Sequence, residues 1–290
     1  MFRRAVILLL ACSCGSFAQK WDEIRVEKLA GGYVYTEGPA WSPDGYLIWS
    51  DVPANQIQKW VPGQKPGVAR ENTAGASGNA YDAKGNLYTC ETRGRRVIRV
   101  DKKGVIELLA DKWEGKRLNA PNDIVVRKDG HVYFTDPAFG NQAATRELDF
   151  YGLYHLPPKG PLELIAKSKG RPNGVALSPN GKILYVTNSD ERAVYAYDVD
   201  GKGAAARERK LISGIAGAPD GIRADEKGNL YIAATGVAVY SPEGKLLHTI
   251  EMGETPRNLA FGEADYQTLF ITALSSVYRI RLDVKGAVQY

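Results

Sequence analysis

The sequence predicts an all-β protein, a six-bladed β-propeller whose last blade is closed by the N-terminal strand. One observation is a hairpin pattern that occurs six times, with starts roughly forty to fifty residues apart. A second is that further short strands follow each copy. The third is a spare strand before the first copy, which can complete the sixth copy from the other end of the chain.

Each hairpin has the same order of residue types: a polar residue, a short apolar run, a turn and a second apolar run. The pattern is clearest at Pro121–Pro137, PNDIVVRKDGHVYFTDP, where Lys-Asp-Gly forms the turn. Two such runs joined by a short turn containing glycine are typical of a β-hairpin. The other copies start at Glu37, Ser77, Pro172, Pro219 and Pro256.

Two outer strands are expected after each hairpin. Third strands are predicted at Ile57–Trp60, Val97–Val100, Gly152–Leu156, Val194–Tyr197, Val237–Tyr240 and Val277–Ile280. Fourth strands are predicted at Gly67–Glu71, Ile106–Ala110, Leu162–Ala166, Lys210–Ser213 and Leu246–Ile250. The sixth copy ends without a fourth strand, so we expect Ile24–Ala30 to fill that place and cover the exposed edge.

Residues 1–18 are expected to be a secretory signal peptide. They contain Arg3 and Arg4, an apolar run from Ala5 to Ala11, and a small residue at Ala18. A lipoprotein signal is the alternative, because Leu-Leu-Ala precedes Cys12 and would place a lipid anchor there. Both interpretations predict a periplasmic or secreted protein without a membrane span, in which residues 19–290 form a single propeller domain.

Composition limits the functional classes. The net charge of +5 is small and falls further when the signal arginines are removed, which argues against a nucleic-acid partner. Cys90 is the only cysteine outside the signal region, so no internal disulfide is expected. The three histidines lie outside the register described next, and no Gly-x-Ser-x-Gly motif occurs, which disfavours a serine hydrolase.

Polar residues share one register in the hairpins, eight residues before the turn glycine in the first five copies. We call these the ring residues: Glu37, Ser77, Asn122, Asn173, Asp220 and, in the sixth copy, Arg257. They begin the innermost strands, so they should surround one mouth of the central channel. At any single position, ordinary turn chemistry explains such a residue equally well.

Four ring residues carry carboxylate or amide oxygens: Glu37, Asn122, Asn173 and Asp220. Two converging carboxylates repel each other, and a divalent cation resolves that repulsion. An all-oxygen donor set suits Ca²⁺ best, with Mg²⁺ and Mn²⁺ as alternatives. Zn²⁺ is a weaker alternative because no histidine or cysteine shares the register.

A second polar set ends the second strand of each hairpin, at Asp51, Glu91, Asp136 and Asn188, with Ala234 and Ala273 in the last two copies. A hairpin returns its second strand to the level where the first began, so these residues are expected at the same mouth. The predicted substrate-binding residues are therefore Asn122, Glu91, Asp136, Asn188 and Arg257.

Several segments resemble the bacterial gluconolactonase branch of the regucalcin/gluconolactonase/luciferin-regenerating-enzyme family. They are Glu107–Val126, His131–Gly140, Arg146–Leu156, Arg171–Ser189 and Ala218–Ala233, and Leu-Asn-Ala-Pro-Asn-Asp is the most specific motif. The resemblance implies an axial divalent metal held by Glu37, Asn173 and Asp220, with a further contact from Asn122. In the animal branch an arginine lies two residues before the equivalent of Asn122, where this sequence has Ala120.

The resemblance further implies a divalent-metal-dependent hydrolase that opens a sugar lactone. Asp220 is the favoured catalytic base, because Ala234 and Ala273 leave space for a substrate beside it. A long segment at the same mouth, Pro137–Tyr151, could gate access, and Phe139, Arg146 and Asp149 could touch the substrate. The alternatives are a calcium-dependent phosphotriesterase and a non-catalytic extracellular binding module.

Overall fold

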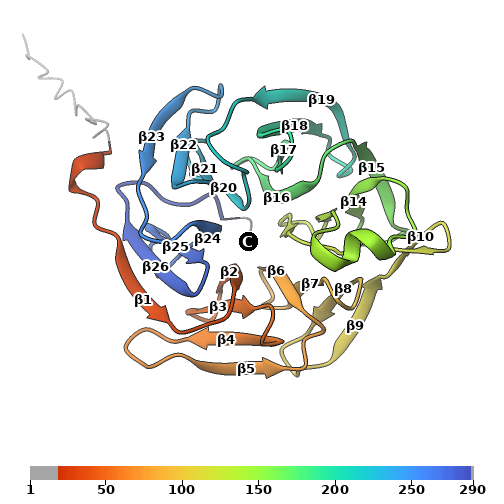
Figure 1. Cartoon of the computed structure of the whole chain (residues 1–290), viewed down its shortest axis with the longest axis horizontal. Helices are drawn as coiled ribbons and strands as arrows, with labels where there is room; N and C mark the ends of the chain where they lie inside the picture. The colour runs from red at the N-terminus through yellow and green to blue at the C-terminus, as the bar shows by residue number, and fades with distance from the viewer. Residues whose placement is uncertain (1–18, 289–290) are drawn as a thin grey trace, which may run out of the picture.

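The structure is a computed structural model that describes residues 19–288, and it contains six four-stranded sheets arranged around a central axis (Figure 1). All strand pairs within the sheets are antiparallel, and strand order runs from the axis outward. The six-bladed propeller prediction is confirmed. The predicted signal peptide and Cys12 lie outside the described residues.

The strands of the first three blades follow chain order. Blade 1 contains β2 (Thr36–Ser42), β3 (Tyr46–Asp51), β4 (Gln56–Trp60) and β5 (Gly67–Glu71). Blade 2 contains β6 (Ala76–Tyr81), β7 (Leu87–Glu91), β8 (Arg96–Val100) and β9 (Ile106–Ala110). Blade 3 contains β12 (Ile124–Val126), β13 (Val132–Asp136), β14 (Tyr151–Leu156) and β15 (Glu163–Ser168).

The remaining blades have the same plan until the last. Blade 4 contains β16 (Pro172–Leu177), β17 (Ile183–Asn188), β18 (Ala193–Val199) and β19 (Ala205–Ile212). Blade 5 contains β20 (Ile222–Ala224), β21 (Leu230–Ala233), β22 (Val237–Tyr240) and β23 (Leu246–Ile250). Blade 6 contains β24 (Pro256–Gly262), β25 (Thr268–Ala273), β26 (Ser276–Arg281) and the N-terminal β1 (Glu27–Gly31).

Closure of the ring by the N-terminal strand is confirmed. β1 pairs with β26 in antiparallel register, with Lys28 opposite Tyr278 and Ala30 opposite Val277. The strand begins at Glu27, three residues later than Ile24, the predicted start. The pairing satisfies the outer backbone edge of β26 and joins residues from the two ends of the chain.

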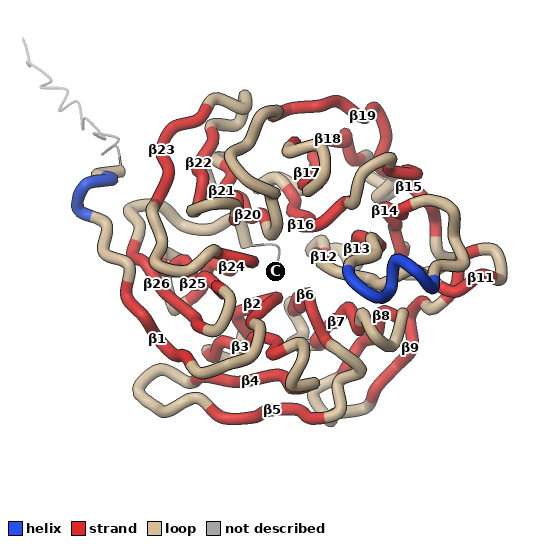
Figure 2. The backbone as a smooth tube through the Cα atoms, viewed as in Figure 1, coloured by secondary structure: helices blue, strands red, loops and turns tan. Residues whose placement is uncertain are grey.

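The largest differences from the sequence-based expectations are in the outer strand of blade 4 and in short elements outside the blades. The outer strand of blade 4 was predicted at Lys210–Ser213, but β19 begins at Ala205, because its exposed charged residues pair with the whole of β18. Four short elements lie outside the blades: η1 (Trp21–Glu23), β10 (Lys112–Trp113), β11 (Lys116–Arg117) and η2 (Gly140–Thr145). Figure 2 shows η2, in blue, in front of blade 3, and it lies within the predicted long segment.

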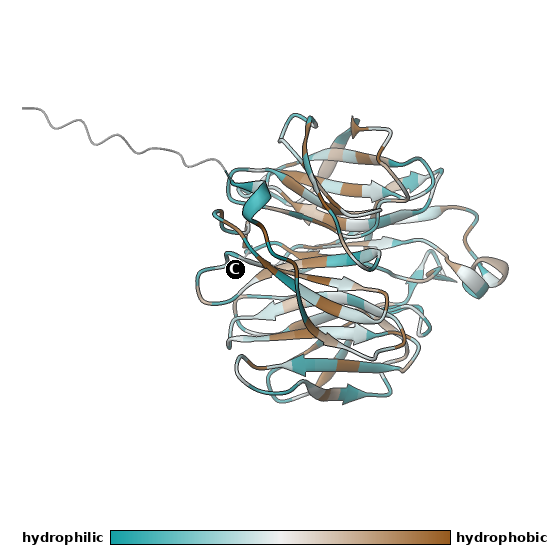
Figure 3. Ribbon diagram, turned by 60° about the vertical axis from the view of Figure 1, so that its left-hand side comes forward, coloured by the Kyte–Doolittle hydropathy of each residue, from teal (hydrophilic) through white to brown (hydrophobic). Residues whose placement is uncertain are grey.

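The hydrophobic core lies between neighbouring blades. Apolar residues alternate with polar ones along the strands (Figure 3), as expected for sheets packed face to face. Between blades 6 and 1, Trp41 stacks on Phe270 with ring centroids 5.6 Å apart. Such an aromatic pair contributes about 0.5–1.5 kcal/mol beyond area burial. These contacts hold the inner strands in fixed positions around the axis.

The C-terminal segment crosses the end of the channel where the hairpin turns lie. Gly286 N donates to Tyr266 O and Ala287 N donates to Ala224 O, both at 2.9 Å. Val288 then reaches a small cavity of about 110 Å³ that is also lined by Trp41 and Val125 from the inner strands. Within residues 19–288, no helix is long and apolar enough to cross a membrane.

Candidate functional site

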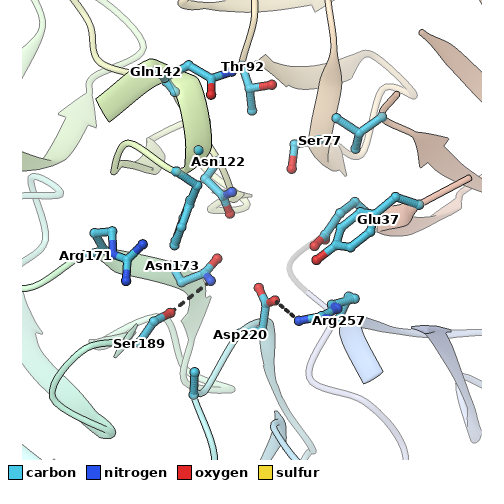
Figure 4. Close-up of a pocket in the computed structure, with 16 residues that line it drawn as sticks. Glu37, Ser77, Thr92, Asn122, Gln142, Arg171, Asn173, Ser189, Asp220 and Arg257 are labelled. Atoms are coloured by element: carbon cyan, nitrogen blue, oxygen red, sulfur yellow. Dashed lines mark hydrogen bonds and ion pairs between the residues drawn. The ribbon is translucent and has the colours of Figure 1, made fainter. Parts of the chain in front are cut away.

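All six ring residues line a single pocket at the channel mouth opposite the C-terminal segment, with a volume of about 460 Å³. Figure 4 shows the oxygens of Glu37, Asn122, Asn173 and Asp220 directed toward a common space. The shared register therefore does bring residues from six blades together. Their roles as metal ligands and catalytic base stay predictions.

Local irregularity of the inner strands turns the ring side chains toward the axis. In blades 1, 2, 4 and 6 the pairing of the first two strands shifts register beside the ring residue, as between Glu37 and Ala40. Such a bulge re-aims the side chain next to it. In blades 3 and 5, Asn122 and Asp220 lie two residues before the regular strand begins. Each ring residue therefore lies where its inner strand departs from regular pairing with the second strand.

Hydrogen bonds between blades hold the ring backbone in place. Gly78 N donates to Asn122 O at 2.7 Å, and Gly221 N donates to Arg257 O at 2.8 Å. Thr187 Oγ1 donates to Asp220 O at 2.6 Å. The close approach of neighbouring blades requires glycine after Asn173, because a Cβ on Gly174 would lie 2.4 Å from Asp220 O.

A buried side-chain oxygen of the ring, Asn173 Oδ1, lacks a hydrogen-bond partner within the described part of the chain. Asn173 Nδ2 donates to Ser189 Oγ at 3.1 Å, and Ser189 Oγ donates onward to Pro219 O at 2.8 Å. This orientation leaves Asn173 Oδ1 buried and without a donor in residues 19–288. A buried acceptor without a partner is costly, so the site is arranged to receive a ligand there.

The ring carboxylates are poorly solvated and repel each other. Burial, reinforced by the negative charges of Asp220 and Asp123, raises the pKa of Glu37 well above its ordinary range. Burial also raises the pKa of Asp220 to about 7, although Arg257 opposes the change. Arg257 Nη1 lies 3.8 Å from Asp220 Oδ2, and its guanidinium stacks over the Tyr35 ring at 5.2 Å. The positive charge of the Arg257 side chain thus offsets only part of the negative charge of Glu37 and Asp220.

The donor set fits a hard divalent cation. Two carboxylates and the free amide oxygen of Asn173 face the pocket, and Asn122 adds a second amide. In residues 19–288 no group of three or more His, Cys, Asp or Glu side chains has a metal-binding arrangement, so any cation here depends on the amides. Oxygen ligands of this kind suit Ca²⁺ and Mg²⁺ better than Zn²⁺.

Three predicted substrate-binding residues do not reach the pocket. Glu91 is fully buried and accepts hydrogen bonds from Arg70 and Arg96, each at 2.6 Å. Asp136 accepts from the backbone N–H groups of Asn119 and Ala120 at 2.8 and 2.7 Å.

The third is Asn188, which accepts from Glu191 N at 3.0 Å and donates to Ser168 Oγ. The prediction that Glu91, Asp136 and Asn188 line the pocket is therefore corrected. They lie at the expected end of the strands, but their side chains are hydrogen-bonded to groups of their own blade and, through Arg70 and Ser168, of the preceding blade.

Comparison with known proteins agrees with this architecture. Residues 35–275 match the family described as the SMP-30/Gluconolactonase/LRE-like region. The chain belongs to this family. It is 34% identical to the gluconolactonase of Zymomonas mobilis subsp. mobilis, over 90% of this chain and 82% of that protein. It is 27% identical to the pentonolactonase XacC of Haloferax volcanii, over 81% of this chain and 80% of that protein.

A solved structure gives the same family. The chain superposes on the gluconolactonase from Xanthomonas campestris with a TM-score of 0.84 and 35% sequence identity. The match covers 90% of this chain and 91% of that one.

In this member of the SMP-30/Gluconolactonase/LRE-like family, the pocket contains residues that the sequence analysis did not assign to it. Four of them lie two residues before a ring residue, and we call them the second ring: Tyr35, Ala120, Arg171 and Ala218. Residues two apart on an extended chain point to the same side, so this spacing could have identified them. Three more directly follow the second strand of their blade, at Val52, Thr92 and Ser189.

The segment containing η2 forms one side of the entrance. Phe139, Gly140 and Gln142 line the pocket, as expected for a segment at this mouth. Arg146 and Asp149, the other candidate substrate contacts, are not among the lining residues, and Arg146 instead stacks on the Tyr151 ring at 4.7 Å. Arg95 Nη2 donates to Thr145 Oγ1 at 2.5 Å and connects η2 to blade 2. The entrance wall is thus tied to the propeller at its far end.

Proposed function

We propose that this protein is a divalent-cation-dependent hydrolase that opens the ring of a lactone, with a sugar lactone as its substrate. The observation that carries the proposal is the convergence of the buried Glu37 carboxylate, the partly buried Asp220 carboxylate and the unpartnered Asn173 Oδ1 in one pocket. Membership of a family that contains gluconolactonases and a pentonolactonase supports the reaction class.

Glu37, Asn173 and Asp220 would hold the cation, with Asn122 as a further ligand or substrate contact. When bound, a divalent cation supplies positive charge that polarises the lactone carbonyl and stabilises the negative charge of the tetrahedral intermediate. The inter-blade hydrogen bonds of the ring keep the ligand oxygens in position before substrate arrives.

Asp220 is proposed as the general base. Its carboxylate would take a proton from water as the water oxygen attacks the lactone carbonyl carbon. The carbonyl–ring-oxygen bond then breaks, and the proton passes to the ring oxygen, which leaves as the hydroxyl group of a hydroxy acid. A pKa raised to about 7 by burial suits proton transfer near neutral pH, and bound cation would lower it. The positive charge of Arg257, next to Asp220, stabilises the ionised form of the Asp220 carboxyl group.

The remaining pocket groups match a polyhydroxylated ligand. Ser77, Thr92, Asn122 and Gln142 place hydroxyl and amide groups around the cavity. Tyr35 and Phe139 add ring surface, on which the C–H faces of a sugar can lie. A cavity of about 460 Å³ accommodates one hexonolactone together with water.

The direct test is hydrolysis by chelator-treated protein before and after Ca²⁺ is restored. Initial rates would be measured with glucono-1,5-lactone, δ-valerolactone and an aryl phosphotriester. We expect lactone hydrolysis that depends on the cation and is fastest with the sugar lactone. Faster turnover of the phosphotriester would replace the proposal with phosphotriesterase activity. No turnover of any substrate, with Ca²⁺ bound, would favour a binding module.

Export is proposed from residues 1–18. Expression of the full-length chain in a Gram-negative host should yield protein in the periplasm or medium that begins near Gln19. Protein retained in the cytoplasm with an intact N-terminus would contradict this, and a lipid-modified N-terminus at Cys12 would support the lipoprotein alternative.

A further inference from the structure

We infer that Arg171 is a specificity-determining residue, which binds the hydroxyl groups of the substrate and selects hydroxylated lactones over unsubstituted ones. This inference rests on the proposed lactonase function and concerns the same pocket. It begins from the second ring, the set of pocket residues two positions before the ring residues.

Arg171 is the only charged member of the second ring. Its neighbours on the blades to either side are Ala120 and Ala218, and all three line the pocket. Two small residues flanking a long one leave open space beside the guanidinium group. Figure 4 shows Arg171, which carries several hydrogen-bond donors, on the opposite side of the pocket from Glu37.

The guanidinium group is oriented by two contacts. Arg171 Nε lies 3.0 Å from both carboxylate oxygens of Asp190, and Nη2 also donates to Asp190. The group stacks over the Phe139 ring at 4.8 Å. These contacts use one edge and one face of the guanidinium group, and no partner is placed against Nη1 within residues 19–288. A planar group fixed in this way loses little freedom when it binds a ligand.

Charge also favours hydroxyl recognition. Asp190 compensates the charge of Arg171, so the donor does not compete with a cation for Glu37 and Asp220. The Arg171 side chain is 35% exposed and can be reached from solvent through the entrance. Charged donors bind hydroxyl oxygens more strongly than neutral donors do. Phe139 and Gln142 lie on the η2 side of the same entrance, so a sugar ring there would contact all three residues.

The test compares Arg171→Met with wild type on glucono-1,5-lactone and δ-valerolactone, which has the same ring without hydroxyl groups. Losing the charged donor should raise KM for gluconolactone roughly 10- to 100-fold. The KM for valerolactone should change less than about threefold, because that ring offers no hydroxyl to the guanidinium. Arg171→Lys should recover part of the selectivity, since it keeps the charge without the planar fork.

Arg207→Met is the matched control. Arg207 is also paired with an aspartate, with Nε 3.0 Å from Asp198 Oδ2, but it lies on the outer strand β19 with its side chain 82% exposed. This variant should keep the wild-type ratio of the two KM values. Equal losses on both lactones in Arg171→Met, or no loss on either, would overturn the inference.

A binding measurement separates this inference from the hydrolytic proposal. The probe is 1,5-anhydro-D-glucitol, which has the hydroxyl groups and ring of the sugar but no carbonyl to hydrolyse. Calorimetry should detect binding to Ca²⁺-loaded wild type and at least tenfold weaker binding to Arg171→Met, with Ca²⁺ affinity unchanged. Equal affinities, or no binding to wild type, would count against hydroxyl recognition whether or not the protein hydrolyses lactones.

Discussion

The same end of the propeller carries two sets of polar side chains that differ in what they bind. The ring residues begin the inner strands, and the strand-end residues finish the second strands at Asp51, Glu91, Asp136 and Asn188. Both sets contain carboxylates and amides. In the ring, Asn173 Oδ1 has no partner within residues 19–288 and the pKa of Glu37 is raised. In the strand-end set, each side chain accepts hydrogen bonds from neighbouring groups.

The difference shows that residue type does not separate binding from structure at this mouth. Asp51 accepts from the N–H groups of Val34 and Tyr35, as Asp136 accepts from those of Asn119 and Ala120. In both blades the strand-end aspartate therefore holds the segment that carries a second-ring residue. The strand-end aspartates thus fix the backbone segments that carry pocket residues, and the ring residues form the inner surface of the pocket.

The largest expected effect is on turnover, from Asp220→Asn. The amide keeps the size of the side chain and one ligand oxygen but cannot accept a proton. We expect kcat to fall by roughly a hundredfold or more, with an unchanged fold by circular dichroism. Cation content must be measured in parallel at saturating Ca²⁺, because loss of the cation would have the same effect. Near-normal kcat in the loaded variant would assign the base role to another group.

The next effect is on stability, from Asp136→Ala in the strand-end set. This change leaves the buried N–H groups of Asn119 and Ala120 unpaired and should lower the free energy of unfolding by about 1–3 kcal/mol. Ca²⁺ affinity should change by less than about threefold, because Asp136 does not line the pocket. A large loss of Ca²⁺ affinity without loss of stability would remove the distinction between the two sets.

The same variant has a defined pH dependence. Burial raises the pKa of Asp136 to about 7, above its ordinary 3.8, although the Asn119 and Ala120 amides oppose the change. Between these values the native state binds more protons than the unfolded state, so this group's contribution to stability falls as pH rises. The cost of Asp136→Ala, measured by urea unfolding, should therefore be greater at pH 5 than at pH 8. A larger loss of unfolding free energy at pH 8 than at pH 5 would contradict the upward direction of this pKa shift.

A matched asparagine pair tests the comparison through cation binding. Asn173→Ala removes a ring oxygen and should weaken Ca²⁺ binding roughly tenfold or more by calorimetry, with a smaller Ca²⁺-induced rise in Tm. Asn188→Ala, at the end of the second strand of the same blade, should leave Ca²⁺ affinity within about twofold. Unchanged affinity in Asn173→Ala would show that the ring assignment is wrong.

The smallest effect is expected within the ring itself, from Ser77→Ala. Ser77 lines the pocket, and within residues 19–288 the hydrogen bonds to it, from Ser50 Oγ and Asn79 Nδ2, are made to its backbone oxygen and not to its hydroxyl group. Removing the hydroxyl group should change the free energy of unfolding by less than about 0.5 kcal/mol and Ca²⁺ affinity by less than about threefold. A tenfold loss of Ca²⁺ affinity would add Ser77 to the ligand set.

Much of the fold could be predicted because its signals are local. Two apolar runs joined by a short turn predict a hairpin, and this pattern occurs six times, with a turn glycine in the first five copies, so its repetition predicted the number of blades. The absent fourth strand of the last copy predicted the pairing of β1 with β26. The short strands β10 and β11 have no such apolar pattern. Most of β19 also lacks it, so its full length could not be predicted.

The sequence by itself determined the six blades, their closure and the register that gathers Glu37, Asn122, Asn173 and Asp220, because each depends on spacing along one strand or hairpin. Only the tertiary structure decided which polar groups are free. Whether an oxygen is satisfied depends on donors from distant segments, as when Ala120 N reaches Asp136, and on the bulges that aim the ring inward. Arg171 lines the pocket for the same reason: blade 4 brings it beside Phe139 from blade 3, and residue type cannot show that contact.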